Sequence, residues 1–347
     1  MPGPTLPSPD LGLTWRPIST ADIDMWHELV LAIEACDEPA ERLDRDDLIE
    51  ELTAGSYKDP TRDSLIGVDG AGVARAFGHL TPLPGTTLRR VFLWGGVHPD
   101  WRRRGIGREV LEWQTERAHQ AVAEWEASDA TMIGTPWRIS VNHEDRLTDR
   151  AALFESAGYT AIRWFHEMVR PLDADAPPLP DLAVPDGLEI APWTEDLDEA
   201  VRLAHNEAFA GHWGSQPRDD EAWKNWTTQH RTFRRQWSRV VLDPSQRDAD
   251  GRAAVAAYVV SHVYEQDWEA LGHTQARVAL IGVRPAWRGR RLAPVLLADV
   301  MRAFAAGGMD EAGLDVDTGN ATGALSLYEG MGFRAKQTYI TWTLENA

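Results

Sequence analysis

The sequence predicts an α/β protein of the α+β kind, with two tandem domains that are each a mixed, mostly antiparallel sheet flanked by helices. The chain has 347 residues, and at roughly 100–200 residues per domain this length favours two domains. Three short sequence segments recur in the same order in the two halves of the chain. A stretch rich in proline and aspartate separates these halves.

The internal repeat is the first of these signals, because repeats define the architecture before any single motif does. Each copy opens with a short strand followed by a Ser or Thr at a helix-capping position. The matched pairs are GLTWRPIST at 12–20 and GLEIAPWTED at 187–196, VHPDWR at 97–102 and VRPAWR at 283–288, and LFESAGY at 153–159 and LYEGMGF at 327–333. Three matches in one order indicate a duplicated domain.

The boundary between the copies is predicted at residues 173–187. This segment contains four prolines and four aspartates, a composition that neither holds a helix nor joins a sheet, so we expect an extended spacer. The sequence therefore predicts an N-terminal domain at 1–172, the spacer at 173–187 and a C-terminal domain at 188–347.

The elements of the second copy follow from hydrophobic periodicity and turn residues. One face of a helix is marked by Leu292, Leu296, Val300 and Phe304, and Gly307 ends it. The predicted order is strand 188–191, helical turns at 200–209 and 220–229, strand 239–242, turn 248–251, strand 253–264, strand 276–283, that helix, strand 312–316, a short helix through Tyr328 and strand 335–344. The first copy has the same plan, with a hairpin turn at 69–72 and a central strand at 91–97.

Composition excludes several classes of protein. With 35 basic and 54 acidic residues the net charge is −19, so most of the surface repels nucleic acid and anionic lipid. No apolar run approaches the ~20 residues that a membrane span needs, and the MPGP start resembles no secretion signal. The lone Cys36 can form neither an internal disulfide nor a thiolate metal cage. We expect a cytoplasmic monomer or homodimer, with no metal and no nucleic-acid or membrane partner.

The chemistry is predicted at two Arg-rich turns, each joining the end of a buried strand to the start of a helix. The first N–H groups of a helix point outward and carry partial positive charge. Glycines there let a diphosphate approach the backbone closely, and arginines add cationic donors. The candidate binding residues are Val97, Arg102, Arg103, Arg104, Gly105, Ile106 and Gly107 in the first copy, and Arg288, Gly289, Arg290, Arg291, Leu292 and Ala293 in the second.

The order Val-x-Pro-x-x-Arg-x-x-Gly-x-Gly/Ala, followed by Asn and by Tyr-Glu-x-x-Gly-Phe, resembles the GNAT superfamily of acyl-CoA-dependent N-acetyltransferases. The resemblance covers nearly the whole chain as two copies. It implies that the turn grips the pyrophosphate of coenzyme A and that the preceding strand pairs with the pantetheine arm, so acetyl-CoA is the expected cofactor. The first turn matches fully, whereas Arg291 occupies a glycine position in the second. That departure leaves open whether the pyrophosphate can approach the backbone there.

The resemblance also places Asn320 and Tyr328 at two family positions in the second copy. Tyr328 would then lie beside the thioester sulfur, where a positioned phenol can protonate the departing thiolate. The first copy has Arg146 and Phe154 instead. The C-terminal domain is therefore the expected catalytic half, and the N-terminal domain is expected to be structural or to bind acetyl-CoA without turnover.

Two further groups of residues complete the predicted site. A backbone N–H of the central strand, at Ile281 or Val283, would hold the oxyanion. Glu207, His212 and Trp213 would recognise a cationic or ring-bearing amine, or would only pack and cap helices together with Trp223 and Trp226. No single general base stands out: the carboxylates considered, all consistent with solvated surface acids, are Glu265, Asp267, Glu269, Asp315 and Asp317.

The leading hypothesis is transfer of an acetyl group from acetyl-CoA to a primary amine of a small molecule or peptide by direct attack. One alternative moves catalysis to the N-terminal domain, whose turn is complete. A narrower alternative is an acetyltransferase of the mycothiol synthase type, which also resembles two fused GNAT domains. A non-catalytic acyl-CoA-binding or sensor protein is the alternative from another class. The run of His143, Glu144 and Asp145 is not a metal site, because neighbours in an extended chain point in different directions.

Overall fold

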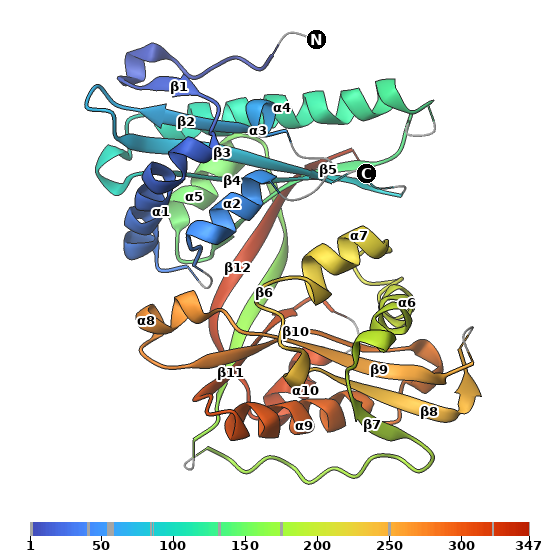
Figure 1. The fold of residues 1–347 in the computed structure, drawn as a ribbon. Helices are drawn as coiled ribbons and strands as arrows, with labels where there is room; N and C mark the ends of the chain where they lie inside the picture. The colour runs from blue at the N-terminus through green and yellow to red at the C-terminus, as the bar shows by residue number, and fades with distance from the viewer. Residues whose placement is uncertain are drawn as a thin grey trace. The chain divides into compact units, whose positions relative to one another are not determined.

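The structure is a computed structural model that describes residues 3–39, 42–53, 59–83, 85, 87–130, 133–173, 176–248, 251–320 and 323–346. Residues 174–175 of the predicted spacer and 249–250 of the predicted turn lie outside this part of the chain. The chain forms two compact units, which are residues 1–164 with 339–347 (unit 1) and residues 165–338 (unit 2). Figure 1 shows both with their elements labelled.

The sheet of unit 1 is mixed and mostly antiparallel, as predicted. Its order is β1-β2-β3-β4-β5-β12, and among the neighbours only β4 and β5 run parallel. The strands are β1 (Thr14–Arg16), β2 (Ser64–Val68), β3 (Ala74–Leu83), β4 (Arg89–Val97), β5 (Trp137–Glu144) and β12 (Arg334–Glu345). The hairpin turn predicted at 69–72 joins β2 to β3.

Helices cover both faces of this sheet. The helices are α1 (Ile23–Asp37), α2 (Arg45–Thr53), α3 (Pro60–Asp63), α4 (Ile106–Ser128) and α5 (Thr148–Ser156). On one face, Trp26 of α1 packs with Ile66 and Phe77. On the other, Leu111 of α4 packs with Val91. Alternate residues of β4 and β3 therefore supply two separate cores, as the period of a strand requires.

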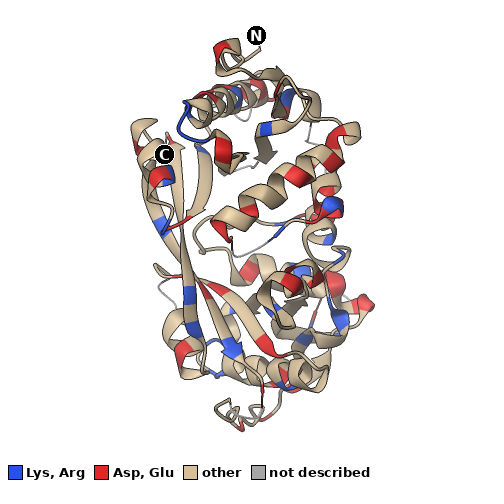
Figure 2. Ribbon diagram, turned by 90° about the vertical axis from the view of Figure 1, so that its left-hand side faces the viewer, with Lys and Arg blue, Asp and Glu red and all other residues tan. Residues whose placement is uncertain are grey.

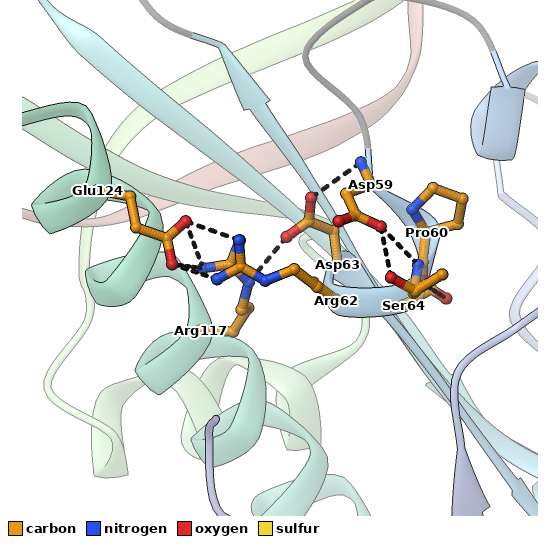
Figure 3. Close-up of polar contacts among 8 residues, drawn as sticks. Asp59, Pro60, Arg62, Asp63, Ser64, Arg117 and Glu124 are labelled. Atoms are coloured by element: carbon orange, nitrogen blue, oxygen red, sulfur yellow. Dashed lines mark hydrogen bonds and ion pairs between the residues drawn. The ribbon is translucent and has the colours of Figure 1, made fainter. Parts of the chain in front are cut away.

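An ion network with a buried pair, Arg117 and Asp63, joins α3 to α4 in unit 1 (Figure 3). Arg117 donates from Nε to Asp63 at 2.8 Å and also contacts Glu124, which accepts from Arg62 as well. Burial raises the pKa of Asp63, while the charge of Arg117 lowers it. The network therefore links α3 to residues 117 and 124 of α4.

Unit 2 repeats the plan. Its sheet order is β7-β8-β9-β10-β11-β6, again with one parallel pair, β10 and β11. The elements are β6 (Thr160–Pro171), β7 (Glu189–Pro192), α6 (Asp198–Ala208), α7 (Asp220–Trp223), β8 (Arg239–Arg247), β9 (Ala253–His262), α8 (Trp268–Leu271), β10 (Gln275–Val283), α9 (Leu292–Ala306), β11 (Glu311–Asp317) and α10 (Ala324–Gly330). The helical turns predicted at 220–229 are present. They form α7, which continues as a π-helix over Lys224–Thr228.

The predicted apolar stripe of α9 is buried in the core of unit 2. Leu292, Leu296, Val300 and Phe304 pack with Ala276, Val278 and Leu314 of the sheet. On the opposite face, α6 places Val201 and Ala204 against Val240, Tyr258 and Val260. Side chains of β10 therefore alternate between the α9 face and the α6 face.

The last strand of each copy joins the sheet of the other copy. Residues 165–171 of β6 pair with residues 311–317 of β11, and residues 339–345 of β12 pair with residues 138–144 of β5. Met168 accordingly joins the core of unit 2 and Trp342 that of unit 1. The predicted boundaries, 1–172 and 188–347, differ from this division. The repeated segments before β6 and β12 are alike, so the sequence does not determine which sheet each of these strands joins.

The described part of the proline-rich segment belongs to unit 2. Residues 176–188 form neither helix nor strand, as predicted. Arg170 donates to the carbonyl of Pro177, and Arg302 donates to that of Pro180 at 2.7 Å. Proline lacks an N–H but keeps its carbonyl, so arginine side chains replace sheet hydrogen bonds and hold this segment on the unit.

Acidic residues recur along the helices of each unit, with basic residues among them (Figure 2). No helix in the described part of the chain is long and apolar enough to cross a membrane.

Candidate functional site

Each unit contains one pair of parallel strands that is joined over only half its length. In unit 2, β10 and β11 pair from Gln275 to Val278. The register of β10 against β9 shifts just beyond Val278, and β10 then continues to Val283 paired with β9. The edge of β10 beyond residue 278 is thus not paired with β11. Extended backbone with an open edge can pair with another extended, amide-containing chain.

The same arrangement occurs in unit 1, where β4 and β5 pair only as far as Leu93 and Val141. Ile281 and Val283, the predicted oxyanion donors, lie in the open half of β10, and Val97 ends the open half of β4. Both copies therefore present an open edge that leads directly into the Arg-rich turn.

The two turns share one backbone conformation although their sequences differ. Arg103 and Gly105 have φ of 64° and 87°, and the equivalent Gly289 and Arg291 have φ of 77° and 62°. Glycine and arginine have exchanged places at two left-handed positions. A left-handed conformation costs about 1–2 kcal/mol for a residue with a Cβ. Arg291 adopts it nonetheless, so the backbone before α9 follows the same course as that before α4.

The last glycine of the motif is interchangeable with alanine for a steric reason. A Cβ at Gly107 would meet Leu153 and Val97 at 3.7 and 3.8 Å, which are ordinary contacts. Ala293 at the equivalent position therefore needs no rearrangement.

The leading arginine of each motif folds back onto its own unit. Arg288 donates to the carbonyls of Val283 at 3.2 Å and Ala208 at 2.8 Å. Arg102 donates to the carbonyl of Val97 at 3.1 Å and to both oxygens of Asp37 at 2.7 and 2.8 Å. These guanidinium groups thus fasten the turn to the strand and to the preceding helix. What the turns offer to an anion is chiefly the N–H groups at the helix starts.

The other arginines of the turns are exposed to solvent. Arg104 donates to the carbonyl of Asp100 at 3.0 Å and lies 4.7 Å from the ring of Trp101. Arg290 and Arg103 are exposed. Ile106 and Leu292, the first residues of α4 and α9, are buried and anchor these helices.

The N-terminal segment of the chain packs against the first half of α4. The N–H of Ser8 donates to Glu109 in the first turn of α4, and Thr5 donates to Glu116 at 2.9 Å. Leu11 packs with the side chains around Ile106. The first turn of α9 contains no acidic residue. An anion therefore meets a carboxylate at the start of α4 and none within the first turn of α9.

Unit 1 also contains a group of charges that we call the Asp37 clamp, made of Asp37, Arg102, Arg146 and Arg150. Asp37 accepts from Arg102 and Arg150, and Arg146 donates to the carbonyls of Asp37 and Glu38 at the end of α1. Charge-assisted bonds of this kind are stronger than neutral ones. The clamp joins the turn after β4 to α5 after β5, which are the two elements that follow the open edge.

Unit 2 cannot form this clamp. Asn320 stands where the first copy has Arg146, and Ala324 stands where it has Arg150. The open edge of β10 is therefore not bridged by charges of this type.

Tyr328 lies on α10 and is 7% exposed. Its ring meets Phe333 edge-on at 6.1 Å, and burial raises the pKa of its hydroxyl to about 12. Among the residues that the structure describes, none hydrogen-bonds this hydroxyl. Phe154 is buried at the equivalent place in unit 1. Asn320 precedes α10, and its N–H donates to the carbonyl of Asp317 at 3.1 Å.

The structure places the predicted acceptor residues at the end of α6 and in the segment that follows it. Glu207 accepts from Arg284 at 2.6 Å, and His212 donates from Nδ1 to the carbonyl of Trp213 at 2.9 Å. Trp213 contacts the ring of Phe165 at 6.5 Å. Of the two tryptophans that follow, Trp223 is buried and Trp226 is exposed.

The carboxylates considered as general bases have separate environments. Asp315 accepts from Arg277 at 2.7 Å, Asp317 accepts from the N–H of Gly319 at 2.9 Å, and Glu265 accepts from Arg234 at 2.8 Å. Asp267 is buried and Glu269 is exposed. The described residues contain no group of three or more metal-ligating side chains. His143 accepts instead from the indole of Trp342 at 2.8 Å.

Sequence reasoning missed a polar cluster on the α6 face of unit 2, formed by His205, Arg218, Tyr258 and His262. The available signal was the presence of Tyr258 and His262 within the apolar strand 253–264. Polar residues that interrupt a buried strand are partnered or functional.

Comparison with known proteins identifies the family. The acetyltransferase (GNAT) family matches residues 197–333. A mycothiol acetyltransferase of Thermomonospora curvata is 30% identical over 269 residues, which cover 76% of this chain and 76% of the relative. The chain belongs to the GNAT family of acetyltransferases. A mycothiol acetyltransferase of Gordonia bronchialis is 28% identical over 278 residues, covering 78% of this chain and 79% of that protein.

Solved GNAT structures share the fold of the whole chain. A GCN5-related N-acetyltransferase from Sphaerobacter thermophilus has a TM-score of 0.73 at 22% identity, covering 98% of this chain and 97% of its own. A tandem GNAT protein from the clavulanic acid biosynthesis pathway has a TM-score of 0.66 at 19% identity, covering 96% and 99%. The predicted family, its tandem fold and the enzyme class, an N-acetyltransferase, are confirmed. GNAT enzymes take the acetyl group from acetyl-CoA.

Proposed function

We propose that unit 2 catalyses the transfer of an acetyl group from acetyl-CoA to a primary amine of a small molecule, and that unit 1 is structural. The observation that carries the proposal is the asymmetry of the two open edges. In unit 2, Tyr328 belongs to the same buried core as Ile281 and Val283 of β10, and no clamp of the Asp37 type bridges the edge. In unit 1, Phe154 belongs to the same buried core as Val91 and Leu93 of β4, and the Asp37 clamp joins the elements that follow the edge.

The residues of unit 2 fit a bound acyl-CoA. The N–H groups at the start of α9 would hold the pyrophosphate, because Gly289 and Arg291 turn the backbone as Arg103 and Gly105 do. The open edge of β10 would pair with the amide groups of the pantetheine arm. Arg290, exposed beside the turn, adds a cation for the phosphates.

Acetyl-CoA, when bound, supplies the acetyl group and the leaving thiol. Tyr328 keeps its proton at neutral pH, because burial raises the pKa of its hydroxyl to about 12, so it can donate that proton to the departing thiolate. A backbone N–H at Ile281 or Val283 would stabilise the oxyanion. The acceptor amine attacks in its unprotonated form and gives its proton to a base or to water.

A matched pair of variants tests which unit binds the substrate. Ala293→Asp and Gly107→Asp each place a carboxylate in the first turn of a helix, where it suits the helix dipole and preserves folding but repels a pyrophosphate. We expect Ala293→Asp to lower kcat/KM for acetyl-CoA at least about tenfold and Gly107→Asp to leave it unchanged, measured by thiol release. The opposite pattern would move catalysis to unit 1.

A specific observation favours one acceptor for the first assay. Relatives that are 30%, 29% and 28% identical to this chain all bear the name mycothiol acetyltransferase. The second candidate function is therefore acetylation of the amine on which these enzymes act. Turnover of that amine well above a panel of other small amines and short peptides would establish it. Its need for acetyl-CoA supports a cytoplasmic location for the enzyme.

A further inference from the structure

The polar cluster of unit 2 lies on the face of the sheet that α6 covers. His205 comes from α6, Arg218 from the segment between α6 and α7, and Tyr258 and His262 from β9. His205 and His262 are only 2% and 4% exposed, and Tyr258 is fully buried. Neither the turn before α9 nor Tyr328 uses these side chains, so their burial needs another reason.

His205 presents a hydrogen-bond donor that nothing accepts. Its Nδ1 lies 2.6 Å from the hydroxyl of Tyr258. Burial raises the pKa of Tyr258, so the hydroxyl is protonated, and among the described residues only His205 hydrogen-bonds it. The phenol therefore donates to Nδ1, and the proton of the neutral imidazole is on Nε2. That Nε2 is buried without a partner in the described part of unit 2, as is Nε2 of His262.

Arg218 is a partly buried cation without a carboxylate. Its guanidinium reaches the hydroxyl of Thr227 at 3.4 Å and lies 5.8 Å from the ring of Trp223, and no described acidic residue pairs with it. In the same unit Arg202, Arg234 and Arg235 each pair with an acid at 2.6 to 2.8 Å. A cation removed from water without a counter-ion is unfavourable, so a site of this kind suits an anionic ligand.

The cluster lies next to the proposed site of acetyl transfer. Tyr258 is the register partner of Gly282 in the open half of β10. Its ring covers that glycine so closely that a Cβ there would stand 2.5 Å from the ring. From Gly282 the contacts lead through Tyr258 to His205. The ring of Trp223 lies 5.1 Å from the ring of His205 and 5.8 Å from the guanidinium of Arg218, so it joins these two residues. If the acceptor binds on this face of β10, the part of the acceptor that does not react would contact the cluster.

We propose that Arg218 and the Nε2–H of His205 form an anion subsite of the acceptor site, so the preferred acceptor carries a carboxylate or a phosphate besides its amine. This inference rests on the proposed function of unit 2. The anion would supply the counter-charge that Arg218 lacks and accept the proton that His205 presents, which gives it charge-assisted hydrogen bonds.

Matched acceptor pairs test this proposal. Acetylation rates are measured for amino acids against their carboxamides and for amino sugar phosphates against the parent amino sugars. Which pair shows the larger difference separates carboxylate from phosphate. We expect the intact enzyme to prefer the charged member. Arg218→Gln should lower kcat/KM for that member about 10- to 100-fold, the range for hydrogen bonds to a charged group, and should leave the neutral member unchanged.

The control variant is Arg302→Gln, which removes a cation from the exposed surface of α9. It should behave as the intact enzyme does. Equal rates for charged and neutral members in the intact enzyme would overturn the proposal, as would an equal loss on both in Arg218→Gln.

A second measurement does not depend on activity. Inorganic phosphate should raise the melting temperature of the protein saturated with coenzyme A, and Arg218→Gln, but not Arg302→Gln, should abolish the shift. If none of the amines is acetylated, the proposed function fails, and this measurement alone decides the subsite. An equal shift in all three proteins would contradict it.

Discussion

Replacing Tyr328 by phenylalanine separates its packing from its chemistry. The ring stays against Phe333, and the lost hydroxyl has no hydrogen-bond partner among the described residues, so the free energy of unfolding should change by less than about 0.5 kcal/mol. If the phenol protonates the leaving thiolate, kcat should fall about 10²- to 10⁴-fold. This corresponds to about 3–5 kcal/mol of transition-state stabilisation.

The assay follows release of the free thiol at saturating acceptor, with acetyl-CoA affinity measured separately by calorimetry. The affinity should be nearly unchanged, because the hydroxyl acts on the leaving group and does not hold the cofactor. Acyl donors with a more acidic leaving thiol should reduce the defect, since their thiolates need less protonation. Because the pKa of Tyr328 is about 12, the intact enzyme should lose no activity to ionisation of this group until the pH approaches that value.

Phe154→Tyr is the matched control, because it adds a hydroxyl at the equivalent buried position of unit 1. It should leave turnover unchanged. Full activity in Tyr328→Phe would refute the role of the phenol. Full activity there together with a gain in Phe154→Tyr would move the reaction to unit 1.

Two further predictions concern stability. Arg291→Gly should remove the left-handed strain at φ of 62°, worth about 1–2 kcal/mol, less about 0.4–1 kcal/mol from the greater freedom of the unfolded chain. The melting temperature should therefore rise slightly, and a marked fall would show that the side chain is needed. The second prediction is loss of stability in acid, because burial lowers the pKa of His205 and of His262 to about 3, against about 6.5 when unfolded. Below pH 6.5 the unfolded chain binds more protons, so the free energy of unfolding should fall by about 1.4 kcal/mol per pH unit for each histidine down to about pH 3. Urea titrations at pH 7 and 5 should show this, and His262→Gln should halve the slope; an unchanged slope would contradict it.

The sequence by itself determined the features that depend on neighbouring residues. The stripe from Leu292 to Phe304 identified α9, because a helix has a fixed period. The hairpin turn at 69–72 and the turns before α4 and α9 were read from residues that sit within a few positions of one another. The repeated segments identified the duplication and the family for the same reason, since both copies preserve local backbone geometry at the same places.

Only the tertiary structure decided which distant groups meet. The sequences of β6 and β12 do not determine which strand each pairs with, because their alternation of apolar and polar residues fits either sheet edge equally well. From the sequence, Arg102 is expected to bind phosphate, but in the structure it donates hydrogen bonds to Asp37, 65 residues away. Arg218, His205 and Tyr258 come from three different elements, and their pairing depends on how α6 and the segment after it pack on β9. Local rules set the backbone, whereas long-range packing decides whether a charged or polar side chain is already satisfied or is left to bind a ligand.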